Sequence, residues 1–406
     1  MRNARIEPDV ISYSSGISAC EKGEQWQRAL GLLSEMCEAK LKPNVILSYS
    51  AAISACGKSE QWQHALALVG EMCEMTLEPD VISYSAAISA CEKGEQWRLA
   101  LSLLSGMSEA TVELNTITCN AVISACEKCK QWQQALSLLI AIHDAKLEPD
   151  VISYSAAISA CEKGEQWQRA LSLLSEMWSA KLKPNVISYN AVISACGNGE
   201  QWQRAVALFS EMAAAKLGAD VISYSAGITA CEKGKQWQRA LVLLGEMWEA
   251  KLELRVIYIY NAAISACEKS EQWQQALMLL DEMREANVHP NVISFNAGIS
   301  ACETQWQQAL SLLSVMREAN VVPDSATALR SARARRTGSG SELWHYLARC
   351  WRRSWSPTSS LQWCDQRVRE GRGVAVGLGT GQRDIGGEDG AQRHQLQYVG
   401  QRVREG

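Results

Sequence analysis

Apolar and polar positions follow a pattern along this chain that recurs about every 35 residues. In one representative unit, the run from Ile152 to Cys161 places apolar side chains at i, i+3, i+4 and i+7, namely Tyr154, Ala157, Ile158 and Cys161. This spacing is typical of one face of a helix and not of an alternating strand. A wider apolar stripe from Trp167 to Met177 predicts a second helix. Each unit is therefore predicted to be a helical hairpin.

Breaker residues separate the two predicted helices and end the unit. Gly164 lies between the helices, and we expect it to adopt the left-handed conformation that ends many helices. Pro184 disfavours helix at the residue before it, and Asn185 suits a turn or a helix cap. Because one hairpin cannot bury both of its apolar stripes alone, neighbouring units must stack.

The Gln-Trp tryptophans mark nine copies of the unit, with most steps of 35 residues, two of 36 and a last step of 33. We expect these side chains to pack in the core, since they belong to the apolar stripe. They are Trp26, Trp62, Trp97, Trp132, Trp167, Trp202, Trp237, Trp273 and Trp306.

A 35-residue hairpin that opens V-I-S-Y-[S/N], closes L-x-P-[D/N] and carries Glu-Met in its second helix resembles the pentatricopeptide repeat family. The resemblance covers residues 10–324. It implies an all-α fold, a right-handed α-α superhelix or solenoid of helical hairpins. It further implies that the first helices line a groove for single-stranded RNA, read one base per repeat. The tetratricopeptide hairpin, with a period of 34 residues, fits less well.

Three segments follow from the repeat register. Residues 1–9 align with the end of a repeat, so we expect a truncated half-repeat and a true N-terminus upstream. Residues 10–324 hold nine repeats, of which the second and eighth carry one extra residue and the ninth lacks two. The Gly- and Arg-rich tail, residues 325–406, keeps the 35-residue period in its two Gln-Arg-Val-Arg-Glu-Gly copies. We interpret it as disordered and as frame-shifted repeat sequence.

The resemblance implies that two side chains per repeat select the base, the fifth residue of the opening motif and the residue that closes the repeat. We expect the fifth residues to face an open groove; the same residue types are also common in caps and turns. The pairs are Ser14 with Asn44, Ser50 with Asp80, Ser85 with Asn115, Asn120 with Asp150, Ser155 with Asn185, Asn190 with Asp220, Ser225 with Arg255, Asn261 with Asn291 and Asn296 with Asp324.

By the family code, Ser with Asn favours A, Ser with Asp favours G, Asn with Asp favours U, and Asn with Asn favours C or U. The pair of Ser225 and Arg255 lies outside the code. The predicted target, parallel to the chain, is 5′-AGAUAUNYU-3′. The second, eighth and ninth repeats depart from the length of 35 residues, so the assignment of bases by the code is not regular at these three units.

Two further rows complete the implied RNA site. The second residue of the opening motif is expected to clamp bases between neighbouring repeats; this row comprises Ile11, Ile82, Ile117, Ile152, Ile187, Ile222 and Ile293. A lysine that recurs at the end of the first helix is expected to contact phosphate, or alternatively to pair with the helix dipole. The lysines are Lys22, Lys58, Lys93, Lys128, Lys163, Lys233 and Lys269.

The charge of the chain bears on RNA binding, and its cysteines bear on metal binding and disulfide bonds. Through Asp324 the chain carries 26 Lys and Arg against 37 Asp and Glu, which opposes the binding of a polyanion. Nine of the 15 cysteines recur in one slot on the apolar face, where we expect small packing residues. The lone C-x-x-C at Cys126 and Cys129 has no second half, so we predict no metal site and no disulfide framework.

The implied function is sequence-specific single-stranded RNA binding in organelle RNA metabolism, acting on transcript stability, processing, editing or translation. The implied location is the chloroplast or mitochondrion, although no transit peptide is visible. The deaminase signature is absent and no carboxylate cluster suggests a nuclease, so we predict neither catalysis nor a cofactor, and protein partners would supply any catalysis. No membrane span is visible. The alternative is a helical-repeat scaffold for protein-protein interaction, which the acidic charge favours.

Overall fold

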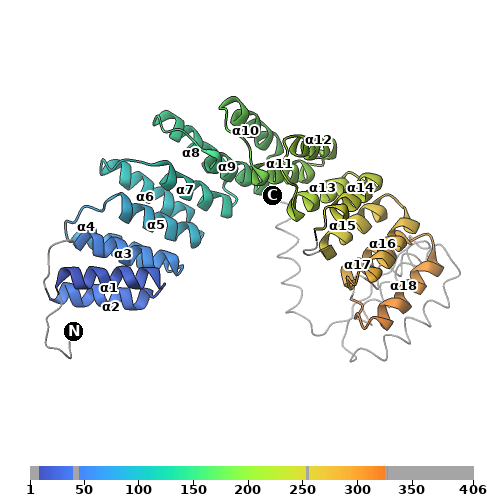
Figure 1. Cartoon of the computed structure of the whole chain (residues 1–406), viewed down its shortest axis with the longest axis horizontal. Coiled ribbons are helices and arrows are strands. Elements are labelled where there is room, and N and C mark those ends of the chain that lie inside the picture. Colours follow the sequence, from blue (N-terminus) through green and yellow to red (C-terminus); the bar gives the residue numbers. More distant parts are fainter. Residues whose placement is uncertain (1–8, 40–44, 253–255, 325–326, 328–406) are drawn as a thin grey trace, which may run out of the picture. The chain divides into compact units, whose positions relative to one another are not determined.

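The computed structural model describes residues 9–39, 45–252, 256–324 and 327, and the regular elements in this part of the chain are all α-helices (Figure 1). The chain divides into two units, residues 1–339 and 340–406, and every described residue belongs to the first. The predicted half-repeat (apart from Asp9) and the predicted frame-shifted tail (apart from Thr327) lie outside the described residues.

Eighteen helices between Val10 and Glu318 form nine hairpins in the described ranges. In chain order they are α1 (Val10–Lys22), α2 (Trp26–Glu38), α3 (Val45–Lys58), α4 (Trp62–Glu74), α5 (Val81–Lys93), α6 (Trp97–Glu109), α7 (Thr116–Lys128), α8 (Trp132–Asp144), α9 (Val151–Lys163), α10 (Trp167–Ser179), α11 (Val186–Asn198), α12 (Trp202–Ala214), α13 (Val221–Lys233), α14 (Trp237–Glu249), α15 (Val256–Lys269), α16 (Trp273–Glu285), α17 (Val292–Ala301) and α18 (Trp306–Glu318).

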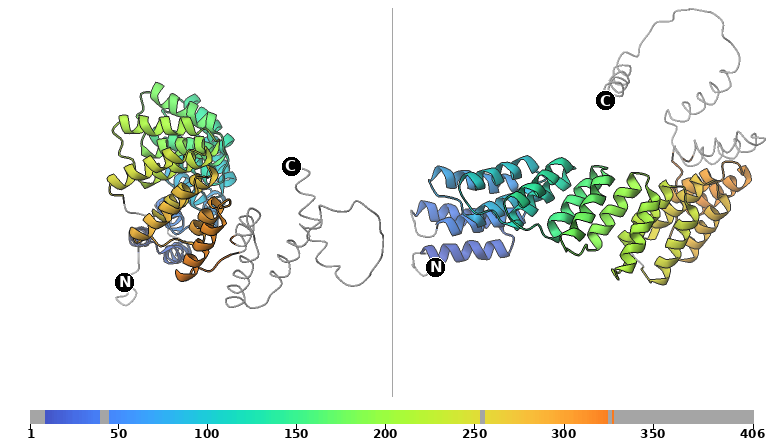
Figure 2. Two further views of the ribbon diagram at one scale, coloured as in Figure 1. Left: turned by 90° about the vertical axis from the view of Figure 1, so that its right-hand side faces the viewer. Right: turned by 90° about the horizontal axis from the view of Figure 1, so that it is seen from above.

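Consecutive hairpins lie side by side in chain order, which is the arrangement of an α-solenoid (Figure 2). Each first helix packs against its own second helix and against the first helices of the neighbouring repeats. Much of an internal first helix is therefore buried, and in α9 the side chains of Ala157, Ile158 and Cys161 are fully inaccessible. Each second helix keeps one face in solvent and buries the other, as the stripe containing Leu173 and Met177 predicted.

The closing residue of a repeat caps the first helix of the next repeat. In α9, the Asp150 carboxylate accepts hydrogen bonds from the Ser153 backbone N–H at 2.8 Å and from the Ser153 hydroxyl at 2.9 Å. A cap of this kind satisfies an N–H group that has no partner within the helix and stabilises by about 0.5–2 kcal/mol. The predicted capping role of the L-x-P-[D/N] closing residue is confirmed.

The predicted left-handed conformation of Gly164 is wrong. Gly164 has φ −89°, and the left-handed residue is Glu165, with φ 58°. Glycine occupies this slot for a different reason, because a Cβ atom on Gly164 would lie 2.3 Å from Cδ1 of Trp132 in the preceding repeat. The same contact recurs between Gly94 and Trp62. The glycine therefore provides space for the tryptophan of the preceding hairpin.

The repeat tryptophans are half-buried at the junctions between repeats, apart from Trp306, whose side chain lies outside the described set. The Arg204 Cζ atom of the next repeat lies 4.8 Å from the centroid of the Trp167 ring. The ring centroids of His64 and Trp26 are also 4.8 Å apart. The tryptophans thus pack between one hairpin and the next at the edge of the core, and not inside it as expected.

Candidate nucleic-acid interface

The second residue of each opening motif forms a row of exposed apolar side chains on the first helices. The seven isoleucines predicted as clamps are between 57% and 76% exposed. Each lies in the first turn of its helix, and the row includes Ile152 on α9, Ile187 on α11 and Ile222 on α13. Because exposed Ile side chains at a fixed position would gain from burial, this row is available to contact flat apolar ligands.

Two members of this row were missed from the sequence. In the second and eighth repeats the first helix is one residue longer at its start, 14 residues instead of 13. The extra residue therefore moves Leu47 and Tyr258 into the position three residues before Ser50 and Asn261, where they are 51% and 63% exposed. Counting backwards from the fifth residue, instead of forwards from the repeat start, would have found both.

The two side chains of a repeat that are expected to select the base, here called a reader pair, are hydrogen-bonded to each other in five repeats. The amide N–H of Asn120 donates to Asp150 and that of Asn190 donates to Asp220, each at 3.1 Å. Three other pairs meet at 3.2 to 3.5 Å, namely Ser50 with Asp80, Asn261 with Asn291 and Asn296 with Asp324. The closing residue thus caps the next first helix and at the same time orients the fifth residue of its own repeat.

In two repeats the serine hydroxyl bonds elsewhere. Ser155 donates to the backbone oxygen of Val151 at 2.6 Å and lies 2.8 Å from the hydroxyl of Ser188 in the next repeat. Ser85 makes the same contacts with Val81 and Thr118. Asn44 and Arg255, the closing partners of Ser14 and Ser225, lie outside the described residues.

Six of the nine fifth residues are buried, which is more enclosed than expected, while Ser14, Ser85 and Ser225 are half-buried. Asn190 is only 8% exposed and Ser155 only 7%, because both lie at the junction of consecutive first helices. The fifth residues were expected to project into an open groove. In the structure they instead form a polar strip between consecutive first helices, here called the reader floor, and the exposed isoleucine row lies beside it.

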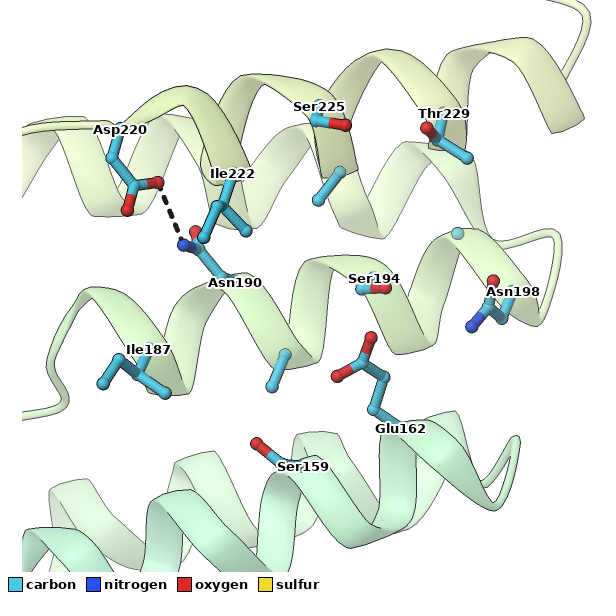
Figure 3. Close-up of a pocket in the computed structure, with 13 residues that line it drawn as sticks. Ser159, Glu162, Ile187, Asn190, Ser194, Asn198, Asp220, Ile222, Ser225 and Thr229 are labelled. Atoms are coloured by element: carbon cyan, nitrogen blue, oxygen red, sulfur yellow. Dashed lines mark hydrogen bonds between the residues drawn. The ribbon is translucent and has the colours of Figure 1, made fainter. Parts of the chain in front are cut away.

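A pocket of about 350 Å³ opens on this face where α9, α11 and α13 meet (Figure 3). Asn190 and Asp220 line it together with Ile187 and Ile222, so one reader pair and two clamps share one cavity. The Asn190 amide oxygen is buried and has no hydrogen-bond partner. A buried acceptor without a donor costs about 1–3 kcal/mol, so Asn190 Oδ1 is an unsatisfied group beside the pocket.

The recurring lysines lie at the ends of the first helices, and four of them bind a glutamate of the preceding repeat. Lys58 pairs with Glu21 at 3.0 Å, Lys128 with Glu92 at 3.3 Å, Lys163 with Glu127 at 2.9 Å and Lys269 with Glu232 at 2.9 Å. Asn198, which takes the lysine position in the sixth repeat, lines the pocket with Asn190. The lysine row therefore borders the same face as the readers.

The recurrent cysteines pack inside the first-helix layer. Burial raises the pKa of the thiols of Cys91, Cys126, Cys161 and Cys231 to about 11, so these thiols are protonated at neutral pH. Within the described ranges, no group of three or more His, Cys, Asp or Glu is placed to hold a metal ion. None of the helices described here is long and apolar enough to cross a bilayer.

The fold and this face define an α-solenoid of helical hairpins with a repeated polar and apolar groove. Three family models match the sequence. The PPR repeat family matches residues 114–163, 149–198, 184–233 and 255–304, the pentatricopeptide repeat domain matches residues 1–59, and the PPR repeat matches residues 47–77 and 82–112. The matched segments together span more than half of the chain, which therefore belongs to the pentatricopeptide repeat family.

Two solved structures are similar to this chain to different degrees. The pentatricopeptide repeat protein PPR10 from maize is 21% identical, with a TM-score of 0.60 over 88% of this chain and 51% of that chain. This chain thus spans about half the length of the maize protein. The PPR domain of Arabidopsis thaliana protein-only RNase P 1 in complex with tRNA is 13% identical, with a TM-score of 0.39 over 46% of this chain and 95% of that one. A comparison with curated proteins found no match.

Proposed function

We propose that this protein binds single-stranded RNA in a sequence-specific manner, one base per repeat. The observation that carries the proposal is the pocket between α9 and α13, where a reader pair, two exposed clamps and an unpartnered amide oxygen lie together. Because the same residues recur on consecutive first helices, the groove offers one such subsite after another. The maize relative, which shares the fold, has also been solved in complex with an 18-nucleotide psaJ RNA element, and this supports RNA as the ligand.

The chemistry of the subsite suits an unstacked base. The exposed isoleucines would cover the two faces of the base, and the edge would meet the amide of Asn190 or the hydroxyl of Ser155. Single-stranded RNA is recognised in this way, since splayed bases expose both their faces and their hydrogen-bonding edges. Asn190 Oδ1 lacks a donor, and a small shift of the side chain toward the pocket would let it accept from the imino N–H of uracil, which agrees with the U that the family code gives at the sixth repeat.

The proposed target remains 5′-AGAUAUNYU-3′, and the proposed setting is organelle RNA metabolism in the chloroplast or mitochondrion. In this proposal the protein acts on transcript stability, processing, editing or translation by occupying its site. Protein partners would provide any catalytic step. The site residues are the reader pairs and clamps given above, with Leu47 and Tyr258 added to the clamps.

Equilibrium binding of the full chain to the nonamer, against a scrambled nonamer of equal composition, tests this function. If two base-edge hydrogen bonds are lost at about 1 kcal/mol each, the scrambled RNA should bind roughly 30-fold more weakly. Each measurement is made at a stated salt concentration, since affinity for a polyanion depends on it. Equal affinity for both RNAs would contradict sequence-specific recognition.

A peptide-binding scaffold is the second candidate, and the excess of acidic residues through Asp324 favours it. In that case the exposed isoleucine row would contact apolar side chains, and basic peptides would bind better than RNA. A basic peptide that displaces the nonamer at equal concentration, with no preference among RNA sequences, would support the scaffold over the RNA-binding function.

A further inference from the structure

The lysine row at the ends of the first helices consists of two kinds of lysine. Lys58, Lys128, Lys163 and Lys269 each form an ion pair of 2.9 to 3.3 Å with a glutamate on the preceding first helix. The glutamate side chains are 20% to 25% exposed, so they are held in place and do not move freely in solvent. Ser54 adds a hydrogen bond of 2.8 Å to Glu21, and Ser265 adds one of 3.0 Å to Glu232.

Lys93 and Lys233 differ because the residue that should pair with them is glycine. The position of the pairing glutamate is occupied by Gly57 ahead of Lys93 and by Gly197 ahead of Lys233. Lys93 instead donates to the backbone oxygen of Lys58 at 3.3 Å, and Lys233 donates to the Asn198 side-chain oxygen at 2.6 Å. Both acceptors are uncharged, so the charge of each lysine is not neutralised.

Packing explains why glutamate is absent at these two places. A Cβ atom on Gly197 would lie 3.0 Å from the Ala230 Cβ and 3.2 Å from its Cα, and one on Gly57 would lie 3.2 Å from the Ala86 backbone oxygen. The first helices approach closely at these junctions, and a larger side chain would not fit without a shift. The charge pattern therefore follows from helix packing.

The lysine position lies beside the base subsites. Asn198 holds that position in the sixth repeat, and it lines the pocket together with Ile187 and Asn190 (Figure 3). A single-stranded RNA whose bases contact the reader side chains thus has its phosphate backbone within reach of the lysine row. A lysine paired with a carboxylate presents no net charge to a phosphodiester, whereas a lysine bonded to a neutral oxygen presents a full charge.

We propose that Lys93 and Lys233 are the phosphate contacts of this row, and that Lys58, Lys128, Lys163 and Lys269 instead connect neighbouring repeats. The proposal rests on the RNA-binding function proposed above. It places the backbone contacts in the third and seventh repeats and explains how a solenoid with excess acidic residues could still hold a polyanion. Lys22 is outside the comparison, because no first helix precedes α1 in the described part of the chain.

The test is the salt dependence of nonamer binding by full-length variants. The double variant Lys93→Gln with Lys233→Gln should lower the slope of log Kd against log salt by about 1.4, since each phosphate contact on a single strand contributes roughly 0.7. The double variant therefore binds more weakly than the unmodified chain at about 50 mM salt, and the ratio of the two Kd values falls about sevenfold by about 200 mM. The matched variant Lys128→Gln with Lys163→Gln, with the same charge change, should leave the slope unchanged.

A gain of binding provides the second arm. Glu92→Gln with Glu127→Gln releases Lys128 and Lys163 and should steepen the slope by up to about 1.4. Glu176→Gln with Glu211→Gln, on exposed positions of α10 and α12, removes the same charge and should not change the slope. Circular dichroism of each variant checks that it is folded.

The outcomes separate the two proposals. An equal loss of slope in both lysine variants, with specific binding by the unmodified chain, would overturn the assignment of Lys93 and Lys233 and leave RNA binding intact. No specific binding by the unmodified chain would overturn the proposed function, and this assignment with it.

Discussion

Two junctions of the solenoid have nearly the same sequence but differ in chemistry. At the junction of α7 and α9, and at that of α11 and α13, an Asn donates to an Asp at 3.1 Å. At the first junction, the Asn120 oxygen accepts a hydrogen bond from the Ser153 hydroxyl at 2.6 Å. At the second junction, the oxygen of Asn190 has no donor and lines a pocket. The family code assigns U to both.

The difference continues along the same helices. Glu127 pairs with Lys163 at the first junction, whereas Gly197 leaves Lys233 with a neutral partner at the second. Repeats that look like copies therefore provide subsites of unequal energy. What distinguishes them is Glu127 against Gly197 at the same position of the first helix, and whether a hydroxyl donates to the asparagine oxygen.

The largest expected effect is on base recognition at the sixth repeat. Asn190→Ala should weaken binding of the nonamer by about 1–3 kcal/mol, roughly 5- to 150-fold, because the acceptor that uracil would satisfy is lost. Asn120→Ala should cost less, since a hydroxyl already occupies the Asn120 oxygen. Equilibrium binding of both variants measures the difference. Equal losses would show that the two junctions are equivalent.

The second-largest effect is expected on the free energy of unfolding, when the junction of α11 and α13 is given the residue found at the junction of α7 and α9. Gly197→Glu gives α11 the residue that α7 carries, but its Cβ would press on Ala230, and overpacking of this kind costs about 1–3 kcal/mol. A lower urea midpoint would reveal the cost. Glu127→Gln breaks only a partly exposed ion pair and should cost at most about 1 kcal/mol. A midpoint for Gly197→Glu at or above that of the unmodified chain would contradict the packing argument.

A third change should act equally at both junctions. Lys130 and Glu200, the residues that follow the turn position after α7 and α11, both have φ 58°. Replacing either by glycine should stabilise the chain by up to about 1 kcal/mol, because glycine adopts this conformation without strain. Thermal unfolding measures the gain. A destabilising effect at either site would show that the strain is not there.

The smallest effect should be on pH dependence. Burial raises the pKa of Glu162 above its ordinary value of 4.5, although the Ser194 hydroxyl and Lys163 act in the opposite direction. A raised folded-state pKa means that stability is greatest with Glu162 protonated and falls as pH rises through that pKa. Glu162→Gln should therefore stabilise the chain at pH 7 and have no such effect at pH 3. Urea unfolding at both pH values tests this, and an advantage that is larger at pH 3 would contradict it.

Much of the fold was predictable because the repeat provides nine copies of the same evidence. The 3.6-residue periodicity around Ile158, the stripe around Leu173 and the capping role of Asp150 all depend on local sequence, and the structure confirms them. The conformation of Gly164 was not predictable in the same way. Its role depends on Trp132, which belongs to another repeat and meets it only after stacking.

The candidate site shows the same division. The exposed row containing Ile152 and the pairing of Asn190 with Asp220 both follow the family pattern. The burial of Ser155 and the ion pair of Lys163 with Glu127 could not be predicted, because each depends on the distance between two first helices. Sequence determined which residues share a face, and packing determined which of their atoms remain available.

Base exchange at the sixth repeat tests the central claim most directly. Asn190→Ser, with Asp220 retained, converts the pair to the combination that favours G. The full-length variant should bind the nonamer with G at the sixth position more tightly than the one with U, while the unmodified chain should show the opposite preference. If both proteins rank the two RNAs in the same order, the groove does not read bases through these residues.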